Sequence, residues 1–84
     1  MKYKAIVSVM PLREILDPQG KAVQQAVRQL GISPIMDVRI GKQIELQIEA
    51  ADLISAQKAA EEASAKILAN PIIEEFRIVV LEVE

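Results

Sequence analysis

The sequence predicts an α+β fold, a two-layer sandwich with the element order β-α-β-β-α-β and a mainly antiparallel sheet. Apolar and polar residues alternate in short segments near both ends and in the middle of the chain, which is typical of strands. Between those segments lie two stretches with apolar residues three and four positions apart, which is typical of helices. Because 84 residues are fewer than an average domain contains, we expect one domain spanning 1–84.

The first strand is expected over residues 2–10, where the alternation puts Ile6 on the opposite face from its apolar neighbours. Pro11 has no N–H group and should end the strand. A first helix is expected to begin at Asp17-Pro18, with the carboxylate as N-cap and the proline in the first turn. Its apolar residues form one stripe, and Gly31 should end it in a left-handed conformation.

A hairpin is expected next, with strands over 36–40 and 44–48. Its turn lies at Gly41-Lys42, where a two-residue loop and a slightly longer turn fit equally well. A second helix is expected to start at Asp52 or Ser55, to continue to about Ala69 and to bury a face of small residues that extends to Ile67 and Leu68.

The last strand is expected from about Glu75 to Glu82, after a helix stop at Asn70-Pro71. Both of its faces are apolar, so we expect both to be covered. With two helices on one face of the sheet, the element order is that of the ferredoxin-like sandwich, and the other face needs a second copy of the chain. The candidates for this self-association are Val79, Leu81, Val83 and Ile6.

Composition excludes several functional classes. The sequence has no histidine and no cysteine, so the usual nucleophile–base pairs, zinc sites and disulfides cannot be built from it; we expect no catalytic residue, no metal and no cofactor. A net charge of −2 and two aromatic residues disfavour nucleic-acid binding. No apolar run approaches the length of a membrane span, and a cytoplasmic location is expected.

Three local motifs are candidates for a functional role. The segment 16–21 fits a helix cap better than an anion site, because Asp17 would repel an anion. The segment 37–42 places Asp37, Arg39 and Lys42 at the expected hairpin tip, where they either contact a partner or form an ordinary solvated turn. The segment 70–77 places Ile72 and Ile73 where they could meet a partner.

Taken together, these blocks resemble the PurS family over essentially the whole chain. The blocks that carry the resemblance are Tyr3-Lys4-Ala5, Leu16-Asp17-Pro18-Gln19-Gly20, Asp37-Val38-Arg39-Ile40-Gly41-Lys42, Asn70-Pro71 and Glu75-Phe76-Arg77-Ile78. The resemblance implies a non-catalytic assembly subunit of phosphoribosylformylglycinamidine synthase, the ATP- and glutamine-dependent ligase of purine biosynthesis. Its implied partners are the synthetase subunit PurL and the glutaminase subunit PurQ, which it would bridge while supporting the transfer of ammonia.

The residues independently favour an assembly role, because 51% of them are apolar and the mean hydropathy is +0.23 in a short chain without cysteine. We therefore expect a homodimer or a dimer of dimers. Two alternatives stay open at this point, a small regulatory ligand-binding domain of ferredoxin-like type and a stand-alone enzyme. The enzyme would need a carboxylate or lysine with a strongly shifted pKa in a closed pocket.

Overall fold

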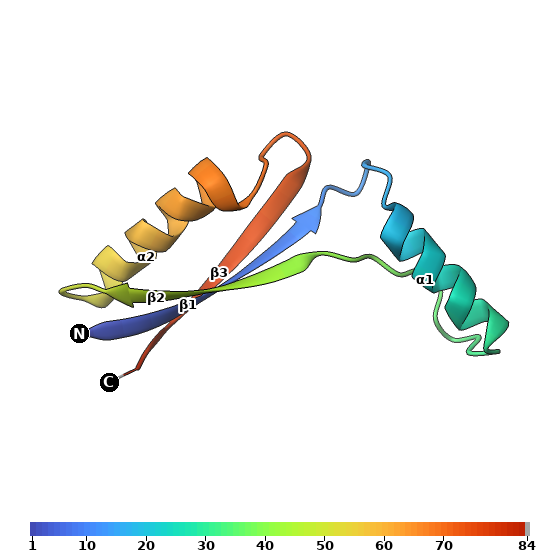
Figure 1. The fold of residues 1–84 in the computed structure, drawn as a ribbon, viewed down its shortest axis with the longest axis horizontal. Coiled ribbons are helices and arrows are strands. Elements are labelled where there is room, and N and C mark those ends of the chain that lie inside the picture. Colours follow the sequence, from blue (N-terminus) through green and yellow to red (C-terminus); the bar gives the residue numbers. More distant parts are fainter. Residues whose placement is uncertain (84) are drawn as a thin grey trace.

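The computed structural model describes residues 1–83 and confirms the α+β class. Its elements are β1 (Lys2–Pro11), α1 (Pro18–Gln29), β2 (Lys42–Glu49), α2 (Leu53–Ala63), the short π-helix η1 (Ser64–Leu68) and β3 (Glu74–Glu82). The molecule is elongated, with principal extents of 50 × 28 × 14 Å. In Figure 1 the sheet and α2 occupy one end of the long axis, and α1 occupies the other end.

The sheet has three strands in the order β2-β1-β3, and both pairs are antiparallel. Strand β1 is central because its two neighbours bond to its two edges. The register places the odd-numbered residues of β1 on one face, and the four apolar residues among them, from Tyr3 to Val9, are almost completely buried. This alternation is the period-two pattern that the sequence shows.

Helix α2 covers that face of the sheet. Asp52 caps it by accepting a hydrogen bond from the N–H of Ser55 at 2.8 Å. Ala56 and Ala60 are fully buried, because their methyl groups let the helix approach the strands closely. Val7, Val9 and Ala69 form the core cluster between these layers.

The end of the second helix differs from the expectation. Residues 64–68 form one π turn, closed by a 3.0 Å bond from the N–H of Ala69 to the carbonyl of Ser64. The wider turn brings Ser64 and Ala69, five positions apart, toward the sheet. Ile67, which the α-helical spacing placed on the buried face, is therefore 79% exposed.

The predicted hairpin is wrong. Only its second half is a strand, β2, and residues 36–40 belong to no strand. Their polar groups bond elsewhere: the N–H of Ile40 donates to Asp17, and the carbonyl of Met36 accepts from Gln24. The backbone of Gly41 lies against the carbonyl of Val9, and at this point the chain that has left α1 enters β2 (Figure 1).

The expectation that both helices lie on the sheet is also wrong. Helix α1 has no substantial packing against any strand, and it projects from the sheet with the segments on either side of it (Figure 1). We call residues 12–41 the arm. The capping predictions for α1 are confirmed, since Asp17 is its N-cap, Pro18 its first residue, and Gly31 has a φ of 79° just after its end.

Candidate partner-binding surface

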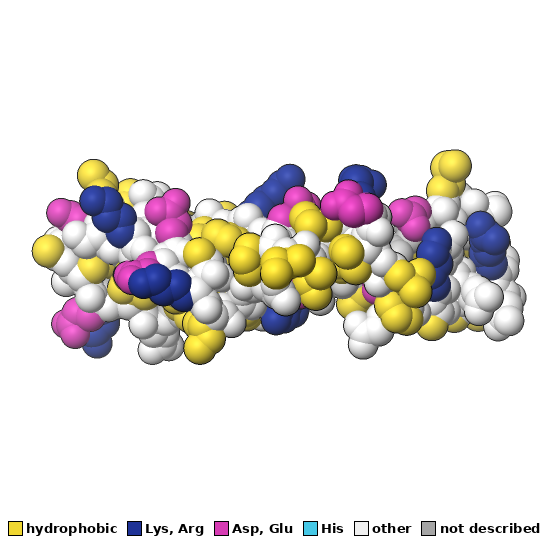
Figure 2. Space-filling model, turned by 90° about the horizontal axis from the view of Figure 1, so that it is seen from above, with side chains coloured by type: hydrophobic (Ala, Val, Ile, Leu, Met, Phe, Trp, Pro, Cys, Tyr) yellow, Lys and Arg dark blue, Asp and Glu magenta, His cyan; other side chains and the backbone are white. Residues whose placement is uncertain are grey.

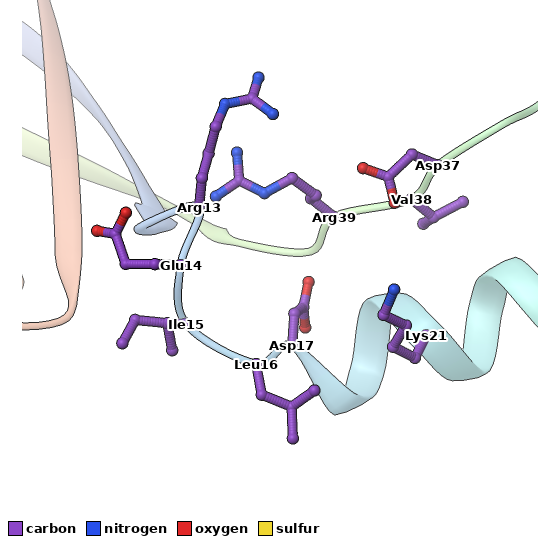
Figure 3. Close-up of a pocket in the computed structure, with 9 residues that line it drawn as sticks. All are labelled: Arg13, Glu14, Ile15, Leu16, Asp17, Lys21, Asp37, Val38 and Arg39. Atoms are coloured by element: carbon purple, nitrogen blue, oxygen red, sulfur yellow. The ribbon is translucent and has the colours of Figure 1, made fainter.

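The arm is joined to the sheet at a small cavity of about 350 Å³ (Figure 3). Asp17 lies at its centre. One carboxylate oxygen accepts from the N–H of Gly20 at 3.0 Å, and the other accepts from the N–H of Ile40 at 2.9 Å. The Asp17 side chain thus caps α1 and also links the segment before α1 to the segment that follows it.

These hydrogen bonds also affect the charge of Asp17. The bonds from the N–H groups of Gly20 and Ile40 lower the pKa of its carboxyl, and the positive charges of Arg39 and Lys21 add to this effect. In Figure 3 the side chain of Asp17, just before α1, and that of Lys21, in α1, both point toward the segment 37–39. The base of the arm is therefore held together around a carboxylate that stays ionised.

The three charged candidates of segment 37–42 do not lie at a hairpin tip. Arg39 is partly buried, and its guanidinium donates to the carbonyl of Pro11 at the end of β1. Asp37 is exposed at the rim of the cavity. Lys42 is exposed as the first residue of β2, where it pairs with Val9. The structure brings Asp37 and Arg39 to one cavity and leaves Lys42 outside it.

Ile72 and Ile73 lie in the loop between η1 and β3. The Ile72 side chain is 80% exposed, while that of Ile73 is 39% exposed. The loop is well held, because the carbonyl of Ile73 accepts from Leu12 and the side chain of Asn70 accepts from Ile72. Figure 2 shows hydrophobic side chains gathered near the middle of the long axis, where this loop lies in Figure 1. A hydrogen-bonded loop thus presents apolar surface to solvent.

The second face of the sheet is covered by neither helix of the described chain. By register, Ile6 lies opposite Val79, and Leu81 lies one pair further along the same face. Val79 is 54% exposed and Leu81 48% exposed, and Val83 is exposed just after β3. We call this surface the open face. The four self-association candidates therefore lie together, as their alternation predicts.

The apolar stripe of α1 is a further exposed surface, although the sequence pattern predicts it to be buried. It was expected to pack on the sheet, yet Val23, Leu30 and the following Ile32 are exposed. The periodic pattern correctly shows that the stripe needs a covering surface, but it does not say whether that surface belongs to the same chain.

Within residues 1–83, no group of three acidic side chains is arranged to hold a metal ion. None of the helices in that range is both long enough and apolar enough to cross a membrane. The candidate site is the surface formed by the open face, the base of the arm and the 70–73 loop, where apolar side chains are exposed.

Comparisons with known proteins agree over nearly the whole chain. Residues 4–82 match the family model "PurS: Phosphoribosylformylglycinamidine (FGAM) synthase". The chain is 43% identical to the PurS subunit of phosphoribosylformylglycinamidine synthase from Bacillus subtilis, covering 96% of this chain and 95% of that one.

Two solved structures are similar in fold. Thermus thermophilus PurS is 34% identical over the whole of both chains, with a TM-score of 0.90. A chain from the structure of PurLQS from Thermotoga maritima is 27% identical and has a TM-score of 0.89, covering 96% of this chain and 99% of that one. The protein belongs to the PurS family.

Proposed function

We propose that this chain is the non-catalytic assembly subunit of phosphoribosylformylglycinamidine synthase in purine biosynthesis. In this role it joins the glutaminase subunit PurQ to the synthetase subunit PurL and supports the transfer of ammonia between them. Support comes from the family and from the name of the PurLQS structure, whose matching chain has the same fold. The expected cytoplasmic location stays a prediction.

The observation that carries this proposal is the amount of apolar surface that the chain leaves uncovered. Fifteen large hydrophobic side chains are exposed among the described residues, and eleven of them lie on the open face, on the arm and in the 70–73 loop. Exposing these side chains to water does not stabilise an isolated chain of this size, which indicates that other proteins cover them. Separate apolar surfaces on one small chain fit a protein that contacts several neighbours.

The open face is the surface proposed for self-association, as a homodimer or a dimer of dimers. Its apolar residues form a stripe along β1 and β3, and the neighbouring strand β2 contributes polar residues such as Glu45, which pairs with Lys4 at 3.6 Å. An apolar centre with a polar border is the usual arrangement of a protein interface.

The base of the arm and the 70–73 loop are the surfaces proposed for PurL and PurQ. They lie at one end of β1, because the carbonyl of Ile73 bonds to Leu12 and the guanidinium of Arg39 bonds to Pro11. Asp37 and Lys42 flank this region and are free to meet a partner's charges.

The direct test is reconstitution. The chain alone should neither hydrolyse ATP nor release ammonia from glutamine, and adding it to PurL and PurQ should restore glutamine-dependent product formation. Size-exclusion chromatography of the mixture, with glutamine and nucleotide present, should show all three proteins in one complex. Product formation that is the same with and without this chain would contradict the assembly role.

A further inference from the structure

A second cavity, of about 540 Å³, lies where the open face meets the base of the arm. It is lined by Ser8, Met10, Arg13, Arg39, Glu75, Phe76 and Arg77. The sequence contains four arginines, and three of them line this one cavity although they come from three separate segments. We call it the arginine cavity.

The register explains how these residues meet. Ser8 pairs with Arg77 and Met10 pairs with Glu75, so the open-face ends of β1 and β3 form the floor. Arg13 lies two residues after the end of β1, and Arg39 lies in the segment between α1 and β2. Arg13 and Arg39 also line the cavity at the base of the arm, and in Figure 3 the side chain of Glu14 points away from them.

The three arginines are short of anionic partners. None of their guanidinium groups lies within 4.0 Å of a carboxylate in residues 1–83, where the ion pairs are Lys4 with Glu45 and Lys66 with Glu62. Arg39 is held in place by its bond to the carbonyl of Pro11. Gathering three positive charges around the single lining acid Glu75 costs free energy in the empty site, and a bound anion lowers that cost.

The charge of the lining indicates the kind of anion. Within the lining, three arginines against the single acid Glu75 leave two positive charges in excess, and Asp17, whose charge interacts with that of Arg39, lies outside the lining. A phosphate monoester carries a charge of roughly −1.5 to −2 at pH 7 and offers three acceptor oxygens, whereas a carboxylate carries only one charge. Guanidinium groups bind phosphate through pairs of parallel hydrogen bonds, and the Ser8 hydroxyl adds another donor.

We propose that the arginine cavity binds the phosphate group of a small phosphate ester. This goes beyond the assembly function, since it assigns a ligand to the isolated chain. It does not depend on PurL or PurQ, so its test can fail while the assembly role stands.

The experiment is a calorimetric titration of the full chain at constant ionic strength with ribose 5-phosphate, inorganic phosphate, ribose and acetate. Both phosphates should bind saturably, while ribose should not bind and acetate should bind at least tenfold more weakly. A lower Kd for ribose 5-phosphate than for inorganic phosphate supports a site for the whole ester, and equal values support a site for the phosphate group alone.

The matched variants are Arg13→Ala and Arg77→Ala, whose side chains are exposed, and Arg28→Ala, the arginine of α1 outside the cavity. Arg13→Ala and Arg77→Ala should each weaken phosphate binding about tenfold or more, because each removes charge-assisted hydrogen bonds. Arg28→Ala should change the Kd for phosphate by no more than about twofold, because Arg28 does not line the cavity. Equal losses in all three variants, acetate binding as tight as phosphate binding, or no saturable phosphate binding would each overturn the proposal.

Discussion

The carboxylate of Asp17 accepts a hydrogen bond of 2.9 Å from the N–H of Ile40, across 23 positions of sequence. The same side chain caps α1 through Gly20. From its sequence position, Asp17 is predicted to act only as the N-cap. The bond to Ile40 makes Asp17 the point where both ends of the arm meet.

Acid should loosen the arm. The folded-state pKa of Asp17 is lowered, so its stabilising effect is fully present above the ordinary value of 3.8 and is lost as the pH falls from there through the lowered folded value. Asp17→Asn should lower the melting temperature at pH 7 and make it less sensitive to acid between about pH 5 and pH 2. Thermal unfolding followed by circular dichroism across this range measures both effects.

Asp37→Asn is the control for that measurement, because the Asp37 side chain is exposed and accepts no hydrogen bond from residues 1–83. It should leave the melting temperature at pH 7 and the acid response close to those of the unchanged protein. An acid response that is equal in both variants would show that Asp17 does not hold the arm.

Gly20→Ala should destabilise the protein although it lies in a helix. Helix propensity alone favours alanine over glycine by up to about 1 kcal/mol. A methyl group at Gly20, however, would collide with the carboxylate of Asp17 and with the backbone carbonyl of Val38. We expect the free energy of unfolding to fall by about 1–3 kcal/mol, the usual cost of overpacking, as measured in a urea titration. A gain in stability would show that the arm moves aside at little cost.

A charge on the open face should separate self-association from folding. Val79→Asp should change the stability of the isolated chain by only about 1 kcal/mol, since the side chain is half exposed, but it should abolish self-association by burying an unpaired carboxylate. Sedimentation velocity at micromolar concentration compares it with Gln57→Asp on the exposed side of α2. A monomer for the unchanged protein, or equal association of both variants, would argue against this interface.

The 70–73 loop allows a closely matched pair of variants. Ile72 is 80% exposed and Ile67 is 79% exposed, so replacing either by glutamate should change stability by no more than about 0.5 kcal/mol. If the loop contacts PurL or PurQ, Ile72→Glu should weaken assembly about tenfold or more and Ile67→Glu should not. Chromatography of the reconstituted mixture distinguishes the two, and equal behaviour would remove the loop from the proposed interface.

Arg39 and Lys42 need separate variants, because the structure gives them different surroundings. Lys42→Ala should leave stability within about 0.5 kcal/mol, whereas Arg39→Ala should cost about 1 kcal/mol through the lost bond to Pro11. If Lys42 contacts the glutaminase side, Lys42→Ala should lower glutamine-dependent turnover more than ammonia-dependent turnover. An equal loss with both nitrogen donors places the contact on the synthetase, and unchanged turnover with both makes Lys42 an ordinary solvated residue.

Local chemistry in the sequence was sufficient to predict most of the elements. The period-two pattern of β1, β2 and β3, the caps at Asp17 and Asp52 and the left-handed Gly31 follow from side chains within a few positions, and the structure confirms them. The open-face position of Ile6 and Val79 also follows, because alternation assigns faces as soon as strands are paired.

Only the tertiary structure decided which surfaces the chain covers by itself. Segment 36–40 has a strand-like pattern, but its polar groups are satisfied by Asp17 and Gln24 in place of a neighbouring strand. The stripe of α1 likewise shows that the helix needs a partner without saying which one. An apolar pattern shows that a residue favours burial. Whether the same chain or another protein buries that residue depends on contacts between segments distant in sequence. In this protein those contacts place α1 away from the sheet.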